Sequence, residues 1–303
     1  MFLNIFREII EFDTLRYAFI AAFVIGIISP LIGSVVVIRR LSNIADTLSH
    51  FSLAGVVIGV FISKIIPLSF NPILMGIAFS IGGTFLVEKI RNFYKNYKEL
   101  SMAIIISLGV ALTGLFISIT EGISTSFTTS LLFGSIMSVG KFDVILILFF
   151  AATIFVFIGF YYKQVITLCF DETYARISGI NVKALQLLIT IILALAISIF
   201  IELVGVLLIS ALLIVPVASS ILISRSFKGS IIISLVFSEF SILLGFATSH
   251  YLSLPLGSTI AIINMIVLFI IFFIVKINTI KFKKEKKEKK EKKENKNKAS
   301  KPD

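Results

Sequence analysis

The chain has 303 residues, of which 57% are hydrophobic, and its mean hydropathy is +1.06. A soluble domain of this size cannot bury so much apolar material in one core, so the composition excludes an ordinary soluble fold and indicates a membrane protein. The formal net charge is +11, but residues 281–303 alone contribute +7 through twelve Lys, four Glu and one Asp. The positive charge is therefore concentrated in one tail, and we expect no nucleic-acid partner.

Apolar runs close to the ~20 residues needed to cross a bilayer recur along the chain. Because these runs are continuous, and because lipid-exposed segments must satisfy their own backbone polar groups, they predict helices instead of barrel strands. Charged and Pro- or Gly-rich breaks separate nine candidate spans: 17–38, 48–66, 72–88, 101–120, 142–161, 184–200, 203–223, 230–249 and 257–276. The sequence thus predicts an all-α polytopic bundle over residues 17–276. A shorter apolar segment, 126–139, is expected to be a re-entrant or interfacial helix.

Lys and Arg are unequally divided between alternate connections. Eleven lie in one set of connections and four in the other, the richer set being 39–47, 89–100, 162–183 and 224–229. Since positively charged connections face the cytoplasm, we expect residues 1–16 to lie outside the cytoplasmic (inner) membrane and the tail, 277–303, to lie inside. The Lys/Glu-rich tail lacks an apolar face, which predicts a solvated, disordered segment. Binding of the tail to anionic membrane lipid is the alternative.

The clearest polar group at membrane depth begins after Arg39 and Arg40. Asn43 is expected to cap a helix on which Asp46 and His50 stand four residues apart on one face. A carboxylate and an imidazole one turn apart suit a transient Mn(II), Fe(II) or Zn(II) site, because they do not complete a permanent four-ligand cage. The candidate metal-site residues are therefore Asp46 and His50, together with Asn43. The alternative is structural, with Asp46 paired to one of the two arginines and His50 making one interfacial hydrogen bond.

Other polar and small residues suggest further roles. The segment Asp171 to Asn181 lies in a predicted cytoplasmic connection and reads as a short exposed helix, which is either a docking element for a cytoplasmic partner or a lipid-facing connector. The segment Gly205 to Pro216 favours close helix packing, with a local break. Glu202 is expected at an outer turn, either solvated or beside an entry path. Glu239 lies in the middle of a span, so we expect it to face a polar interior or a partner.

Four segments in this order resemble the ABC-3 family of manganese, zinc and iron permeases over roughly residues 15–275. They are Arg39 to His50, Asp171 to Gly179, Gly205 to Pro216 and Leu254 to Gly257. The resemblance places an Asp-x-Leu-Ser-His element on the translocation path, matched here by Asp46, Leu48, Ser49 and His50. It also implies a coupling helix that meets the ATPase, matched by Asp171, Ala175 and Gly179.

The resemblance implies a helical bundle of the vitamin B12 importer type and an assembly of two permease copies with two ATPase subunits. An extracytoplasmic metal-binding protein would deliver the divalent ion, which is cargo and not a permanent cofactor. The sequence has no Gly-x-x-x-x-Gly-Lys-Ser/Thr motif, so ATP hydrolysis is expected in a separate subunit and the chain itself is not an enzyme.

Two other functions compete with the importer. In a secondary transporter, Asp46, His50 and Glu239 would form a proton or ion relay. In an intramembrane enzyme, Asp46 and His50 would act as acid and base, but the other histidine, His250, is expected in an outer loop.

Overall fold

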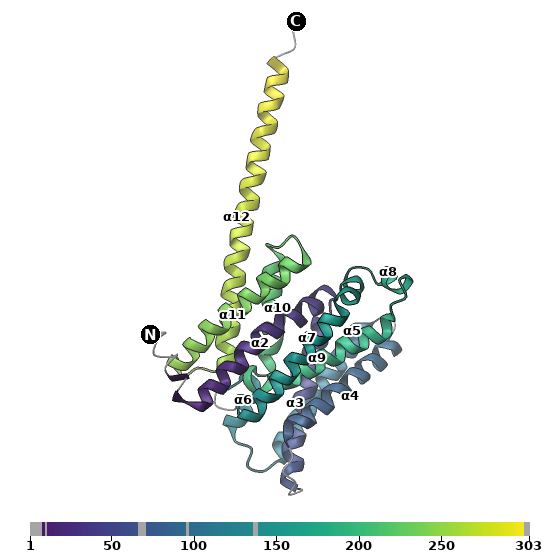
Figure 1. Cartoon of the computed structure of the whole chain (residues 1–303), viewed down its shortest axis with the longest axis vertical. Helices are drawn as coiled ribbons and strands as arrows, with labels where there is room; N and C mark the ends of the chain where they lie inside the picture. Colours follow the sequence, from purple (N-terminus) through teal and green to yellow (C-terminus); the bar gives the residue numbers. More distant parts are fainter. Residues whose placement is uncertain (1–7, 10, 66–70, 95–96, 136–138, 300–303) are drawn as a thin grey trace.

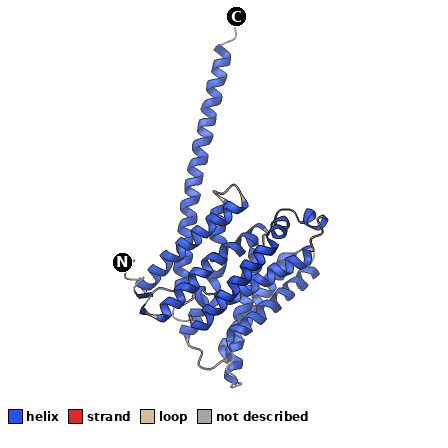
Figure 2. Ribbon diagram, in the orientation of Figure 1, coloured by secondary structure: helices blue, strands red, loops and turns tan. Residues whose placement is uncertain are grey.

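The computed structural model describes residues 8–9, 11–65, 71–94, 97–135 and 139–299, and this part of the chain is helical without strands (Figure 2). The helices are α2 (Asp13–Ile38), α3 (Ser42–Ile65), α4 (Pro72–Phe93), α5 (Lys98–Ile119), α6 (Thr125–Phe133), α7 (Lys141–Phe170), α8 (Glu172–Ile177), α9 (Val182–Val204), α10 (Val206–Ile221), α11 (Phe227–Leu252) and α12 (Leu256–Ala299). Figure 1 shows them as an inclined bundle from which α12 projects.

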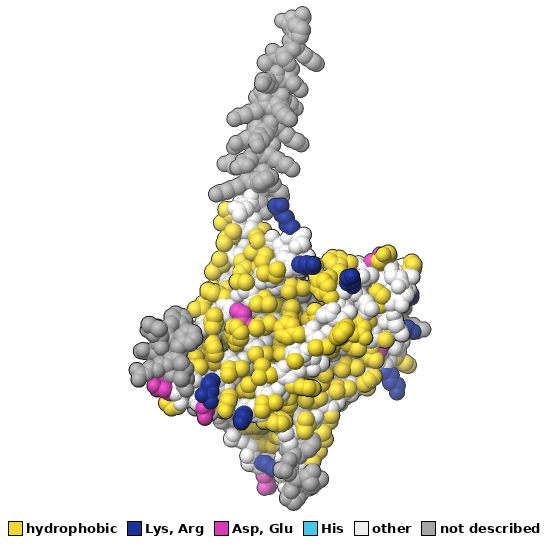
Figure 3. Space-filling view, in the orientation of Figure 1, with side chains coloured by type: hydrophobic (Ala, Val, Ile, Leu, Met, Phe, Trp, Pro, Cys, Tyr) yellow, Lys and Arg dark blue, Asp and Glu magenta, His cyan; other side chains and the backbone are white. Residues whose placement is uncertain are grey.

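The all-α membrane fold predicted from the sequence is confirmed. Eight of the described helices are long and apolar enough to cross a bilayer, and α10 is a shorter apolar helix. Apolar side chains cover the face of the bundle seen in Figure 3, and most Lys and Arg lie near its two ends. The predicted boundaries were too narrow in places, because α3 begins at Ser42 and α7 continues to Phe170. Hydropathy finds the part of a helix that lies in lipid and misses turns that extend into the interface.

The junction between α9 and α10 lies inside the bundle, not at a surface loop. At Gly205 the backbone has φ +82°, and the space of a Cβ there is filled by backbone atoms of Leu132 and Gly134 at the end of α6. With 16 residues, α10 is only about 24 Å long, less than the ~30 Å hydrocarbon core. An interruption of the helical backbone is tolerated at Gly205 because other helices of the protein, and not lipid, surround it.

The structure around Gly205 differs from the sequence prediction in the place of the turn and in the place of the helix break. The turn falls at Gly205, so the backbone of Glu202 belongs to the last turn of α9, while its side chain lies outside the described part. Pro216 lies inside α10, which continues to Ile221, so the predicted local break occurs at the glycine and not at the proline. The short segment predicted at 126–139 overlaps α6, which begins one residue earlier and packs against α9, α10 and α12; residues 136–138 lie outside the description.

The tail differs from the predicted disordered segment, because α12 continues through it to Ala299. Lys and Glu are good helix formers, and pairs such as Glu285 with Lys289 have the i, i+4 spacing that favours a helix. The membrane-spanning part of α12 also supplies a formed helix onto which the tail adds residues without a new nucleation step.

We predict that close packing of α2 on α10 is essential to the bundle. A Cβ added at Gly33 would overlap the carbonyl oxygen of Leu213, whereas a Cβ at Gly114 of α5 would have nothing within 4 Å. Gly33→Ala should therefore destabilise the fold by about 1–3 kcal/mol, as other overpacked substitutions do. Gly114→Ala is the matched control, and it should leave the melting temperature in detergent unchanged or higher. Equal melting temperatures for the two variants would contradict this packing.

Candidate functional site

The candidate site begins at a tight corner between α2 and α3. The N–H of Leu41 donates to the carbonyl oxygen of Val36 at 2.8 Å, and the N–H of Arg40 donates to Val37 at 3.1 Å. These two bonds form a Schellman motif, in which the left-handed position is held by Arg40 (φ +57°) instead of the usual glycine. Because α3 then starts at Ser42, the corner fixes the direction in which α3 leaves α2.

Asn43, Asp46 and His50 share one face of α3, since their spacing is i, i+3 and i+7. Asn43 is exposed and lies within the first turn, so it does not cap the helix. The carbonyl oxygen of Leu41 instead accepts the N–H groups of Ile44 and Ala45. The prediction that Asn43 caps α3 is wrong. It rests on the preference of Asn for cap positions, whereas the Schellman motif starts the helix one residue earlier, at Ser42.

Asp46 receives one long hydrogen bond from a distant helix. Ser210 Oγ of α10 lies 3.4 Å from Asp46 Oδ1, and Asp46 remains partly exposed. Among the described residues Asp46 makes no salt bridge, so the predicted structural alternative of an Asp46–arginine pair is wrong. The carboxylate therefore keeps most of its capacity to accept bonds or bind a cation.

His50 lies one turn further into the bundle and is also partly exposed. Its backbone is in contact with α5, because a Cβ at Gly109 would come within 3.0 Å of the His50 carbonyl oxygen. No group of three or more His, Cys, Asp or Glu that could hold a metal occurs among the described residues. Asp46 and His50, with Asn43 on the same face, are therefore candidates for an open site and not members of a closed four-ligand cage.

The spacing of Asp171, Ala175 and Gly179 has a direct structural cause. Asp171 caps α8 by accepting the N–H of Tyr174 at 2.9 Å, and Ala175 is fully buried. Gly179 has φ +80° and ends the helix in a second Schellman motif, in which the N–H of Ile180 donates to the Ala175 carbonyl oxygen at 3.1 Å. The three residues therefore start, anchor and end one short helix.

Two apolar side chains of α8 are exposed beside polar ones. Tyr174 is 61% exposed and Ile177, three residues later, is 80% exposed. A third apolar side chain, Phe170 at the end of α7, is also exposed. Single exposed apolar residues are common, but two on one turn of a polar connection mark a surface that a partner can cover.

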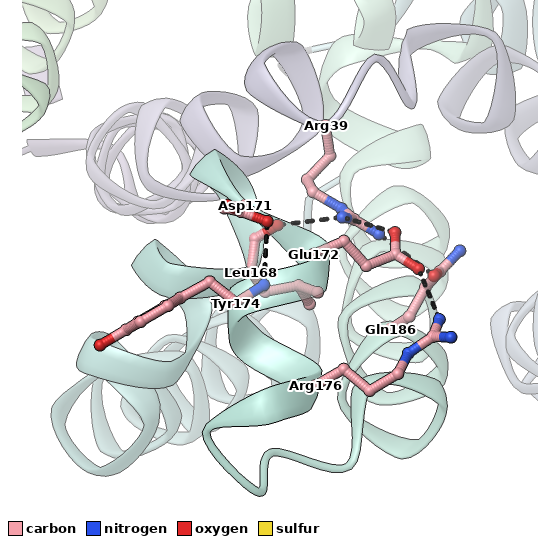
Figure 4. A network of polar contacts seen from close by, with 7 residues as sticks. All are labelled: Arg39, Leu168, Asp171, Glu172, Tyr174, Arg176 and Gln186. Carbon is pink, nitrogen blue, oxygen red and sulfur yellow. Dashed lines mark hydrogen bonds and ion pairs between the residues drawn. The ribbon is translucent and has the colours of Figure 1, made fainter.

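The side chain of Arg39 connects the α2–α3 corner to α8 and its neighbours through hydrogen bonds and an ion pair (Figure 4). Its Nη1 donates to the Leu168 carbonyl oxygen at 3.0 Å and lies 3.4 Å from Glu172 Oε2, and its Nη2 donates to Gln186 Oε1 at 3.1 Å. Glu172 also pairs with Arg176 at 3.3 Å. Sequence reasoning missed this network, because partners 129 to 147 residues away leave no local pattern.

Glu239 is separated from the face of Asp46 and His50. Neither of its carboxylate oxygens is accessible or hydrogen-bonded within the described part of the chain. Glu239 lies on α11 against α2, where a Cβ at Gly26 would come within 2.6 Å of Oε1. No described hydrogen bond joins Asp46, His50 and Glu239, the members of the predicted proton relay.

His250, expected in an outer loop, lies in the last turn of α11, and its Nε2 is 2.5 Å from Glu8 Oε2.

Comparison with known families decides the class of the protein. The model of the ABC 3 transport family matches residues 11–276. The chain belongs to the ABC 3 transport family. The match includes the α2–α3 corner, α8 and nearly the whole of the spanning helices, so this ABC 3 permease is a multi-pass membrane protein.

Several relatives of this ABC 3 permease have names that specify metal transport. A probable metal transport system membrane protein of Treponema pallidum is 30% identical over 86% of this chain and 94% of its own length. The manganese transport system membrane protein MntC of Listeria monocytogenes is 27% identical over 86% and 90%. The structure of PsaBC from Streptococcus pneumoniae in complex with Fab matches with a TM-score of 0.80 and 27% identity, covering 90% of this chain and 96% of that one.

We predict that the side-chain oxygen of Asp171 stabilises α8 and that its negative charge is not required. Asp171→Ala removes the cap and should lower the local opening free energy of α8 by about 1 kcal/mol. Asp171→Asn keeps a side-chain oxygen at the cap and should retain most of the protection. Hydrogen exchange of the 172–177 amides would measure the difference, and equal exchange rates in the alanine variant and the parent would contradict the capping role.

Proposed function

We propose that this chain is the permease subunit of an ABC importer that moves a divalent transition metal, Mn(II), Zn(II) or Fe(II), into the cytoplasm. The observation that supports this most directly is the face of α3 that presents Asp46 and His50, in a family whose relatives include proteins named for manganese, zinc and iron transport. Asp46 is held only by the 3.4 Å contact from Ser210, so it can exchange that contact for an ion.

The proposed ligands suit an ion that must be released as well as bound. A carboxylate oxygen and an imidazole nitrogen bind all three metals, and thiolates, which would hold zinc or iron more tightly, are absent from the described surroundings of the site. Two or three protein ligands leave further positions on the ion to water or to a second permease copy. The expected homodimer would bring such a copy, and α3 would then line the path of the ion.

The same proposal assigns the energy source to a separate cytoplasmic ATPase. The sequence has no P-loop of its own, and α8 offers an exposed apolar turn, Tyr174 and Ile177, at the predicted cytoplasmic face. An extracytoplasmic metal-binding protein would deliver the ion on the opposite face of the inner membrane.

We predict that Asp46→Asn and His50→Ala each reduce metal uptake while leaving membrane insertion and ATPase assembly unchanged. Asparagine keeps the volume of Asp46 but removes its charge, and alanine removes the ligating nitrogen of His50. Uptake of radiolabelled Mn(II) or Zn(II) into vesicles at matched permease levels would measure the loss. At subsaturating metal we expect a decrease of about tenfold or more for each variant, the size typical of losing one metal-site interaction.

The control for this experiment is His250→Ala, which removes the chain's other imidazole at the far end of α11. It should transport at nearly the parental rate. If the Asp46 and His50 variants also transport normally across the concentration range, both residues are structural. Uptake by the parent that needs no nucleotide would favour the secondary transporter instead.

We predict that α8 docks on the ATPase and that Gly179→Glu uncouples ATP hydrolysis from transport. A side chain at Gly179 would meet nothing within 4 Å in this chain, so it would extend into the space expected for the partner. Gly179→Ala is the matched control, since it imposes the same cost of a positive φ without reaching outward. ATP hydrolysis and uptake should be measured on reconstituted complexes. Normal assembly and transport by the glutamate variant would refute the docking surface.

A further inference from the structure

We propose that Arg39 is the positioning residue through which movement of the coupling helix α8 reaches Asp46 and His50. This inference rests on the proposed function, because it assigns a link between the expected ATPase contact and the expected metal ligands. Arg39 belongs neither to the exposed turn of α8, Tyr174 and Ile177, nor to the face of α3 that carries Asp46 and His50, but its side chain contacts α8 and its backbone borders α3.

The side chain of Arg39 joins three elements on the cytoplasmic side of the bundle. Its acceptors are the carbonyl oxygen of Leu168 in α7, the carboxylate of Glu172 in α8 and the amide oxygen of Gln186 in α9, as Figure 4 shows. Only 11% of the Arg39 side chain is exposed. A guanidinium that is largely buried needs its acceptors, so it must follow them when they move.

The contact with Leu168 has a specific cause. Leu168 lies in the last turn of α7, where carbonyl oxygens lack a helical donor and the helix dipole is negative. The Arg39 guanidinium gives the Leu168 carbonyl oxygen a hydrogen-bond donor and places a positive charge at the negative end of the helix dipole. Two residues after the end of α7, Glu172 begins α8, so Arg39 holds the α7–α8 junction and not merely one side chain.

Apolar packing strengthens the same link. Ala175, the buried residue of α8, belongs to a cluster with Val165, Leu168 and Leu185, and Val35 of α2 packs against this cluster. Val35 lies one turn before Arg39. The last turn of α2 is thus attached to α8 by the guanidinium, and it also packs against the apolar cluster that holds Ala175.

The backbone of Arg39 belongs to the corner that orients α3. Arg39 is the C-cap of α2, and only Arg40 and Leu41 separate it from Ser42, the first residue of α3. The two bonds of the Schellman motif leave this connection little freedom to absorb a shift. Asp46 and His50 lie in the first three turns of the uninterrupted helix that follows. A displacement of α8 that moves Arg39 therefore reorients the face of α3 that carries both ligands.

The geometry also explains why lysine is not equivalent. Nη1 and Nη2 of Arg39 donate in different directions to α7 and α9, with Glu172 beside Nη1. An ammonium group has one nitrogen and lacks this planar fork, so it cannot hold the three acceptors in the same arrangement.

The test is the number of ATP molecules hydrolysed for each Mn(II) ion imported. The permease would be reconstituted with its co-purifying ATPase subunit, and hydrolysis and ⁵⁴Mn uptake would be measured in the same proteoliposomes. We expect Arg39→Gln to raise this ratio by about tenfold or more, within the range of typical coupling between two sites. Arg39→Lys should give a smaller rise. Arg40→Gln, a change of the exposed neighbouring arginine, is the matched control and should keep the parental ratio.

Outcomes for this test are separable. A parental ratio in an assembled Arg39→Gln complex overturns the inference, and so does a parallel fall of hydrolysis and uptake that leaves this ratio unchanged, since Arg39 would then be purely structural. If Arg39→Gln does not assemble, Gln186→Leu, which removes one acceptor and keeps the arginine, decides: a raised ratio supports the inference and a parental ratio overturns it. A parental complex that hydrolyses ATP without importing any metal rejects the proposed function instead.

Discussion

Helices in a bilayer gain little from hiding apolar side chains from one another, because lipid chains are equally apolar. Close approach through small residues and polar contacts between helices must therefore decide how this bundle assembles. At Gly33 the backbone of α2 meets the backbone of α10, a contact that no larger residue would permit. That approach places α10 between α2 and α3, and it is what brings Ser210 of α10 to Asp46 of α3.

Serine hydroxyls fix the opposite side of α3. Ser52 bonds to Ser198 of α9 at 2.8 Å and donates to the Gly76 carbonyl oxygen of α4 at 3.2 Å, and Ser80 of α4 donates to Ala194 of α9 at 3.1 Å. Each such contact between membrane helices contributes about 0.6 kcal/mol, up to roughly 2 kcal/mol. Together these bonds hold the middle of α3, at Ser52, against α4 and α9 and hold α4 against α9. The first turns of α3, with the candidate ligands, depend more on the corner at Arg39.

The sequence predicted what depends on local composition and missed what depends on distant partners. Continuous apolar runs identified the spans, and the Asp171, Ala175 and Gly179 spacing identified α8, because cap, buried contact and left-handed turn all leave a local pattern. The Ser210 contact to Asp46 joins residues 164 apart, and Arg39 finds acceptors on three later elements. The turn at Gly205 was misplaced by a few residues, since hydropathy does not distinguish a break buried in protein from a continuous apolar helix.

The surroundings of Asp46 are consistent with reversible binding of an ion. The neighbouring hydroxyls are committed to their own helix, because Thr47 donates to the Asn43 carbonyl oxygen at 2.7 Å and Ser49 donates to Ala45 at 2.8 Å. These two hydroxyl groups therefore neither donate a hydrogen bond to the Asp46 carboxylate nor compete with it for an ion. At 3.4 Å the bond from Ser210 is near the limit of a hydrogen bond. Under the proposed function, a cation that reaches Asp46 would therefore displace little, and the contact from α10 could re-form when the cation leaves.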